Sequence, residues 1–143
     1  MAQVTLGELR SIDLRVPAVR ASLPRVRSAV RAFTRADDAV LGAEPDVAAA
    51  AADVELAMSE LATNVVEHAP AHEIIARLTE LGRGWELRVA PAEVGAVERI
   101  RGAGLPAPTS PHGRGLAIVR AVMDAVEPDV LDGRPAVRCR RRI

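Results

Sequence analysis

Three polar side chains stand four residues apart in the stretch Glu55–His68, at positions Glu60, Asn64 and His68. Residues at this spacing lie above one another on one face of an α-helix, so the pattern predicts a line of polar groups along one helix. Apolar side chains recur beside them at helical spacing: Val54, Met58, Leu61 and Val65. A carboxylate and a carboxamide in such surroundings are costly to bury unless something satisfies them. The stretch therefore predicts either a core hydrogen-bond network or a site for an ion and its ligand.

One role open to Glu60 and Asn64 is to form a site for Mg²⁺ and phosphate. Mg²⁺ prefers hard oxygen ligands and usually takes one or two from protein, while water and phosphate oxygens complete its octahedron. An Asn carboxamide oxygen suits this role, and a Glu one turn earlier could orient a water or accept a hydroxyl proton during phosphoryl transfer. From these two residues alone, a satisfied polar network in the core is the favoured interpretation.

A second candidate is the segment Gly113-Arg114-Gly115, which lies between an irregular stretch and a predicted helix that continues through Leu116. Glycine lets a backbone approach a ligand closely, and the free N–H groups at a helix N-terminus attract phosphate. The alternative is a simple glycine-rich junction between loop and helix. A dinucleotide-binding fingerprint fits poorly, because no strand precedes these glycines and position 118 is Ile.

The pair His68 and His72 is also spaced by four, which could suggest a zinc site. Pro70 lies between them and breaks the helix, and no third ligand is evident. His68 is therefore expected to close the helix, where its ring N–H meets free carbonyl groups. The Arg-rich tail at 138–142 is interpreted as a solvated sheet edge rather than a nucleic-acid patch, because the formal net charge is zero.

Composition excludes several classes of protein. All 19 positively charged side chains are Arg, which excludes the Lys of a Walker A loop, the strand Lys of eukaryotic-type protein kinases and Schiff-base chemistry. Cys139 is the only cysteine, which excludes internal disulfides and multi-cysteine metal sites. The sequence shows neither a signal peptide nor an apolar run long enough to span a membrane. We therefore expect a cytoplasmic protein that binds neither membrane nor nucleic acid directly.

The hydrophobic periodicity predicts the element order β-α-α-β-β-loop-α-β-β. Strands are expected at 10–16, 73–81, 85–89, 126–131 and 136–142, and helices at about 22–35, 46–69 and from 112 onward. Residues 90–112 contain several prolines and glycines and little regular periodicity, which is typical of a lid or binding loop. Helices and an antiparallel sheet in this order predict a two-layer α/β sandwich that forms a single domain over residues 1–143.

Together, the polar helix, the long loop and the glycine-rich helix start resemble the GHKL ATPase superfamily, which has the Bergerat fold. The resemblance is to its compact branch of bacterial anti-sigma factor serine/threonine kinases. The segment SELATNVVEHA resembles that family's N-box, and HGRGLAIVRAVMD resembles its second glycine box. The similarity extends over about residues 10–142. It implies a mixed, mainly antiparallel sheet covered on one face by helices.

The resemblance also implies a role for each candidate residue. Glu60 would be the catalytic base and Asn64 the Mg²⁺ ligand, and His68 belongs to the same nucleotide-binding motif. Four residues would line the triphosphate beneath a lid at about 96–112: Gly113, Arg114, Gly115 and Leu116.

The first glycine box departs from the family pattern, which is Asp-x-Gly-x-Gly after a strand, with the Asp reading the adenine amino group. In the corresponding stretch Glu93 replaces the Asp, Gly95 is retained and Val97 replaces the second Gly. A different alignment places Gly102-Ala103-Gly104 in the glycine pattern and Ile100 at the Asp position. In the first alignment Glu93 and Gly95 would contact adenine, and the longer carboxylate and the bulk of Val97 would weaken that contact.

The function that the resemblance implies is regulation of a sigma factor. The chain would use ATP and Mg²⁺ to phosphorylate a serine of a STAS-type anti-anti-sigma partner, and would otherwise sequester the sigma factor, generally as a homodimer. The alternative is a docking module of the same fold that acts in the same partner-switching system with weak or no use of nucleotide.

Overall fold

The structure is a computed structural model that describes residues 9–35, 44–69, 71–101 and 114–143. Its elements, in chain order, are β1 (Ser11–Pro17), α1 (Leu23–Arg35), α3 (Pro45–His68), β2 (Glu73–Leu81), β3 (Gly84–Ala90), α4 (Val94–Arg101), α5 (Arg114–Val122), β4 (Ala125–Leu131) and β5 (Arg134–Arg142). A short 3-10 turn precedes α1. Each predicted strand and helix is present, with ends that differ by a few residues.

The described strands form one five-stranded antiparallel sheet in the order β1-β2-β3-β5-β4. Two tight hairpins join β2 to β3 and β4 to β5. At the tip of the second hairpin, Asp132 and Gly133 have φ angles of 51° and 71°. Positive φ at both central residues is the conformation that matches a two-residue turn to the twist of its strands, and Asp-Gly is a favoured sequence for it.

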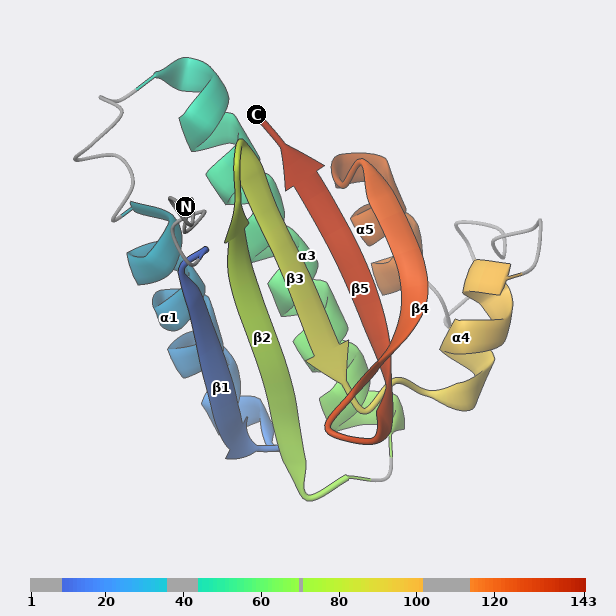
Figure 1. The fold of residues 1–143 in the computed structure, drawn as a ribbon. Helices are drawn as coiled ribbons and strands as arrows, with labels where there is room; N and C mark the ends of the chain where they lie inside the picture. Colours follow the sequence, from blue (N-terminus) through green and yellow to red (C-terminus); the bar gives the residue numbers. More distant parts are fainter. Residues whose placement is uncertain (1–8, 36–43, 70, 102–113) are drawn as a thin grey trace, which may run out of the picture.

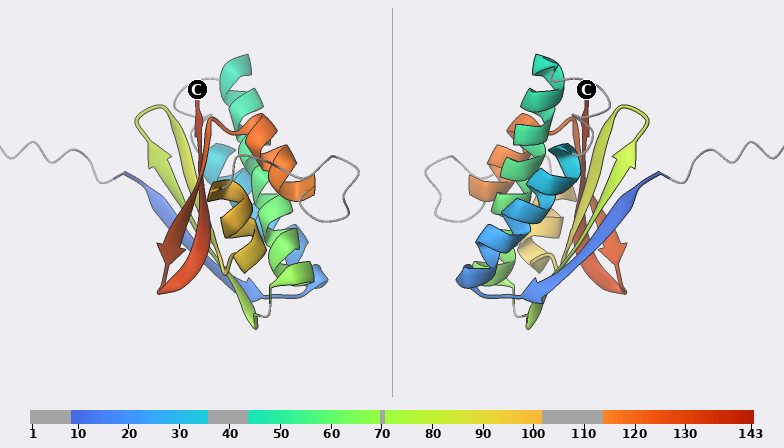
Figure 2. Two further views of the ribbon diagram at one scale, coloured as in Figure 1. Left: turned by 90° about the vertical axis from the view of Figure 1, so that its right-hand side faces the viewer. Right: turned by 90° about the vertical axis from the view of Figure 1, so that its left-hand side faces the viewer.

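Helices α1, α3 and α5 cover one face of the sheet and leave the other face open (Figure 1, Figure 2). The largest fully buried side chains come from both layers, and include Met58 of α3, Leu116 of α5 and Trp85 of β3. The predicted two-layer α/β sandwich is therefore confirmed, with a sheet that is antiparallel throughout its described strands. No described helix has both the length and the apolar character needed to cross a membrane.

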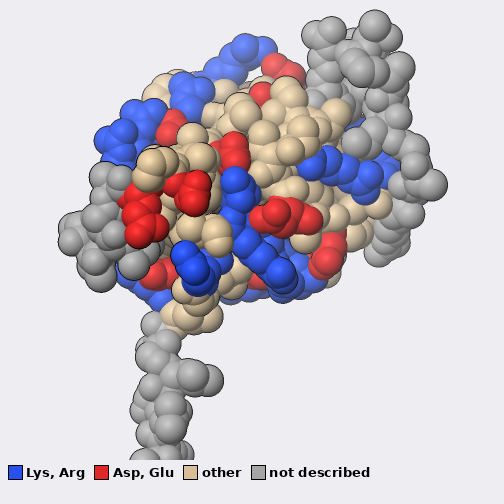
Figure 3. Space-filling view, turned by 90° about the horizontal axis from the view of Figure 1, so that it is seen from above, with Lys and Arg blue, Asp and Glu red and all other residues tan. Residues whose placement is uncertain are grey.

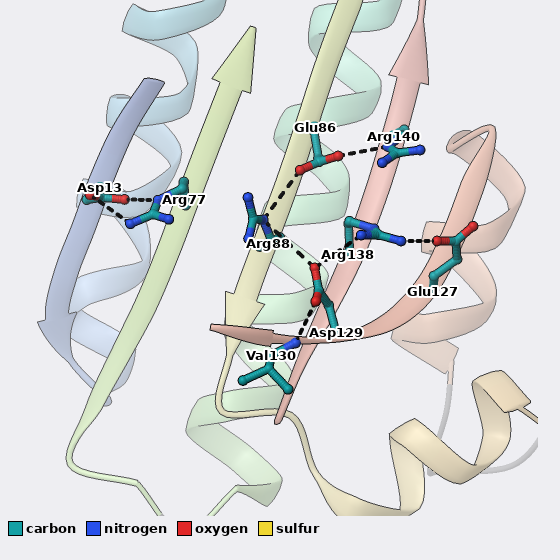
Figure 4. A network of polar contacts seen from close by, with 9 residues as sticks. All are labelled: Asp13, Arg77, Glu86, Arg88, Glu127, Asp129, Val130, Arg138 and Arg140. Atoms are coloured by element: carbon teal, nitrogen blue, oxygen red, sulfur yellow. Dashed lines mark hydrogen bonds and ion pairs between the residues drawn. The ribbon is translucent and has the colours of Figure 1, made fainter. Parts of the chain in front are cut away.

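The open face of the sheet carries a network of paired charges (Figure 4). Arg77 of β2 donates to Asp13 of β1 at 2.6 Å, and Arg138 of β5 donates to Glu127 of β4. The other charged members of the network are Glu86, Arg88, Asp129 and Arg140. The hydrogen bond from Arg77 lowers the pKa of Asp13, and the one from Arg138 lowers the pKa of Glu127. Because these carboxylates face solvent, the network maintains a charged surface more than it stabilises the fold.

Charges of both signs are also interspersed on the face of the molecule seen from above (Figure 3). Basic and acidic groups lie beside one another there, with uncharged residues between them. This mixed surface agrees with the formal net charge of zero.

Helix α4 corrects the prediction that residues 90–112 are irregular. Its first turn closes on the carbonyl of Glu93, which accepts hydrogen bonds from two backbone amides of the turn. Ala96 and Ile100 are four residues apart and both are buried, so one side of this short helix packs inward. A helix of 8 residues offers only two such apolar positions, which is too little periodicity to recognise among flanking prolines and glycines.

Cys139 of β5 faces the helices and is fully buried. Burial raises the pKa of its thiol to about 12, and the nearby Glu86 carboxylate adds to the rise. Because the thiolate is the reactive form, we expect native protein at neutral pH to react with a maleimide roughly a thousandfold more slowly than unfolded protein. Labelling in buffer and in urea, followed by mass spectrometry, measures this ratio. Rapid stoichiometric labelling of the native protein would contradict the burial of Cys139.

Candidate functional site

Helix α3 holds both candidate catalytic side chains on its long run across the sheet. Glu60 and Asn64 are half-buried and stand one turn apart. Their neighbours on the inward side of the helix, Leu61 and Val65, are almost completely buried. The apolar stripe therefore fixes the rotation of α3, and that rotation keeps Glu60 and Asn64 at the border of the core.

Gly115, in the first turn of α5, lies directly against these two side chains. A Cβ atom added to Gly115 would be 2.9 Å from Oε2 of Glu60 and 3.4 Å from both Oδ1 and Nδ2 of Asn64. The next residue, Leu116, is fully buried and anchors the helix start in the core. Free backbone N–H groups at the start of a helix attract anions. The glycine thus lets the first turn of a helix lie close to a carboxylate and a carboxamide.

A small cavity adjoins this group on the side of β3 and α4. Among its ten lining residues only Asn64 and Glu93 have polar side chains; Pro91, Ala92, Ala96 and other apolar residues form the rest. Its volume is about 20 Å³. That is space for about one water molecule, whereas small-molecule sites commonly measure roughly 300–1,000 Å³.

Glu93 borders this cavity, and its carboxylate is paired with an arginine of α4, the helix that follows it. Oε2 of Glu93 lies 3.7 Å from Nη2 of Arg99. Gly95 lies beside the same pair, since a Cβ atom there would be 3.2 Å from Nη1 of Arg99 and 3.5 Å from Oε1 of Glu93. The two predicted adenine-binding residues are thus close together, and the charge of Glu93 is neutralised by Arg99.

Two hydrogen bonds join α4 and its preceding loop to other elements. Arg120 of α5 donates from Nη2 to the carbonyl of Ile100 at 3.0 Å, in the last turn of α4. The amide of Ala92 donates to the carbonyl of Pro135 at 2.7 Å, at the start of β5. Arg99 and Arg120 were not identified from the sequence, and their spacing carries no signal that would have singled them out.

Comparison with known proteins agrees with this arrangement. The family model for the histidine kinase-like ATPase domain matches residues 16–140. The chain belongs to this family. Among solved structures, the RsbU and RsbW domains of Rv1364c from Mycobacterium tuberculosis superpose with a TM-score of 0.61 at 20% sequence identity. The match covers 93% of this chain and 32% of that one, so the chain spans about a third of the larger protein's length. No curated protein gives a significant match.

Membership in the histidine kinase-like ATPase family confirms the GHKL resemblance, and the solved structure supports the same fold. An ATPase domain implies a nucleotide site. Glu60, Asn64 and Gly115 lie close together in the structure. The identity to the solved structure is too low to carry more than the fold. The roles of individual residues therefore remain predictions.

Not every predicted site residue lies beside Glu60, Asn64 and Gly115. His68 lies in the last turn of α3, with Nε2 3.7 Å from Oε2 of the adjacent Glu67, and it does not line the cavity beside Asn64. Gly113 lies outside the described residues, as does the side chain of Arg114. The predicted lid at 96–112 begins inside α4, and its remainder, residues 102–112, also lies outside the described residues.

Proposed function

We propose that this ATPase domain is a Mg-ATP-dependent serine kinase of a STAS-type anti-anti-sigma partner, and that it thereby controls the availability of a sigma factor. The observation that carries the proposal is the contact of Gly115 with Glu60 and Asn64. The backbone in the first turn of α5 lies so close to these side chains that a Cβ atom at position 115 would be 2.9 Å from a carboxylate oxygen and 3.4 Å from the carboxamide. Phosphoryl transfer requires three groups around one point: a helix terminus that binds anions, an oxygen ligand for Mg²⁺ and a base.

In this proposal the roles follow from the chemistry of each group. Asn64 would hold Mg²⁺ through its carboxamide oxygen, and the ion would supply positive charge to the phosphate oxygens. Glu60 accepts the proton of the substrate serine hydroxyl, whose oxygen attacks the γ-phosphorus as the bond to ADP breaks. The backbone at Gly115 would lie against the phosphates, and a side chain at this position would displace the carboxylate of Glu60. Two half-buried polar side chains are thus satisfied by the ligand that they bind.

Glu60, Asn64 and Gly115 suit the phosphates of ATP. Beside Asn64 and Glu93, where adenine is expected, little space remains. A cavity of about 20 Å³ beside Asn64 and Glu93 does not accommodate an adenine ring. Nucleotide binding therefore requires α4 to move outward, which breaks the hydrogen bond from Arg120 to Ile100. A ligand must supply the free energy of that displacement, so we expect weak binding of ATP.

The small volume of this cavity also favours a second candidate, a docking module that regulates a sigma factor or an anti-anti-sigma partner with little use of nucleotide. In that case α4 stays against α5, and Glu60 and Asn64 form a polar network at the border of the core. Both candidates place the protein in the cytoplasm beside its partner. Neither requires contact with membrane or nucleic acid.

Titration of ATP with Mg²⁺ by calorimetry separates the two candidates. The kinase proposal expects measurable binding, and expects Asn64→Ala to weaken it roughly tenfold to a hundredfold because a metal ligand is lost. Thr63→Ala is a suitable control, since the Thr63 hydroxyl only donates back to the carbonyl of Ser59 in the same helix. We expect this variant to bind ATP as the wild type does.

Absence of binding up to millimolar ATP would overturn the kinase proposal and leave the docking module. Equal affinity for wild type and Asn64→Ala would retain nucleotide binding but remove Asn64 from its metal role.

A further inference from the structure

A second cavity lies where the β2–β3 turn meets the start of α3, at one end of the sheet (Figure 1). Its volume is about 180 Å³. An engineered apolar cavity of about 150 Å³ holds one benzene molecule, so this cavity has room for a ligand of roughly that size. It shares no lining residue with the cavity beside Asn64. Val47, which lines it, lies roughly 25 Å from Asn64 along the axis of α3, so the two cavities are separate.

Four of the side chains that line this cavity are apolar: Val47, Leu81, Trp85 and Ile143. Val47 and Trp85 are almost completely buried, whereas Leu81 and Ile143 are half-buried. The β2–β3 turn adds open space, because a Cβ atom added to Gly82 would have no atom within 4 Å. A compact apolar group that enters the cavity would leave water for contact with these side chains, which is favourable.

The charged side chains at the cavity favour a neutral ligand. Glu80 is half-buried, and its Oε2 atom lies 3.2 Å from Nε of Arg10, so its charge is balanced. Glu44 and Arg83 are exposed and opposite in sign, and water and salt screen exposed charges. A charged ligand would lose its hydration without gaining a free, buried counter-charge among the described lining residues. The cavity is therefore better suited to a molecule without net charge.

Trp85 gives the cavity an unused hydrogen-bond donor. Its Nε1 atom is buried and makes no hydrogen bond to any described residue. Buried indole N–H groups usually have a partner, because an unpaired donor has lost its bond to water without replacement. Glu80, the cross-strand neighbour of Trp85, accepts from Arg10 instead. A ligand with an acceptor oxygen would supply the missing partner.

We propose that this cavity binds a neutral small molecule with a compact apolar body and a carbonyl oxygen that accepts a hydrogen bond from Nε1 of Trp85. The site includes none of Glu60, Asn64 and Gly115, so it does not depend on the proposed kinase activity.

Nuclear magnetic resonance with δ-valerolactam tests this proposal directly. The probe is a six-membered ring of about the size of benzene with one carbonyl group. Trp85 is the only tryptophan, so the isotope-labelled protein gives a single indole N–H signal. We expect this signal to move downfield and to saturate as the probe is added. Benzene, which has no carbonyl group, should bind more weakly and should not move the signal downfield.

Trp85→Phe removes the N–H donor and keeps an aromatic ring. We expect it to weaken binding of δ-valerolactam about tenfold and to leave binding of benzene nearly unchanged, since only the hydrogen bond is lost. Saturation-transfer titration, which observes the ligand, measures both affinities. Equal losses for the two probes would show that the variant alters the packing of the cavity and would exclude the hydrogen bond.

Two buried valines of α3 provide a matched pair that leaves Trp85 in place. Val47 lines the cavity and Val54 does not. Val47→Ala should weaken binding of δ-valerolactam roughly fourfold, the equivalent of one methylene group, and Val54→Ala should leave it unchanged.

Three results would overturn the proposal. The first is the absence of a saturable change in the indole signal up to about 50 mM δ-valerolactam. The second is equal binding of benzene and δ-valerolactam with an unmoved indole signal, which would leave the donor to an ordered water only. The third is an equal effect of Val47→Ala and Val54→Ala, which would place the probe elsewhere.

Discussion

Replacement of Glu60 by Gln is expected to reduce serine phosphorylation by about 10²–10⁴-fold, the usual contribution of a general base. Gln keeps the size and the hydrogen-bonding oxygen of the side chain but cannot accept the hydroxyl proton. The contact with Gly115 remains, so the variant should bind Mg-ATP with nearly the wild-type affinity. The measurement is transfer of labelled γ-phosphate to a STAS-domain protein that the chain binds, with calorimetry for ATP affinity.

Glu55→Gln provides the matched control for this prediction. Glu55 lies on the same helix, but its carboxylate is paired with Arg31 of α1 rather than directed at α5. This variant should phosphorylate its partner at the wild-type rate. Equal activity of Glu60→Gln and wild type would exclude Glu60 as the base, and a matching loss in both variants would point to a general effect on the helix.

The sequence predicts best the positions of residues whose spatial neighbours lie on the same helix or strand. Glu60 and Asn64 share a helix face because α3 repeats every 3.6 residues, and the strands follow from alternation bounded by glycine turns. Their contact with Gly115 is different, because α3 and α5 are distant in sequence. The resemblance to a family implied only that all three residues belong to one ATP site, and the close approach at Gly115 agrees with that.

The state of the adenine end could not be predicted in the same way. Whether Pro91, Ala92 and Ala96 fill the space beside Asn64 depends on how β3, α3 and α4 pack together, which no local pattern specifies. The hydrogen bond from Arg120 to Ile100 likewise joins two separate helices. The sequence showed that the first glycine box is altered, and the structure adds that the altered segment forms a helix beside a cavity of only about 20 Å³.

Gly84, the first residue of β3, gives the prediction with the largest effect on stability. Its φ angle is +121°, which side-chain-bearing residues rarely adopt. A Cβ atom at this position would lie 2.0 Å from the carbonyl oxygen of Arg141 in the neighbouring strand β5. Gly84→Ala must therefore both strain the backbone and separate β3 from β5. We expect the free energy of unfolding to fall by about 3 kcal/mol or more, measured by urea denaturation.

Gly82 provides the control because it belongs to the same β2–β3 turn. No atom lies within 4 Å of a Cβ added to Gly82, and its φ angle is not positive. Gly82→Ala should change the free energy of unfolding by less than about 0.5 kcal/mol, as expected for an exposed position without strain. A loss of similar size in both variants would mean that neither glycine position tolerates a side chain, and that the contact with β5 is not the cause. A large loss in Gly84→Ala alone would show that the close approach of β3 to β5, in the middle of the sheet, is what requires glycine.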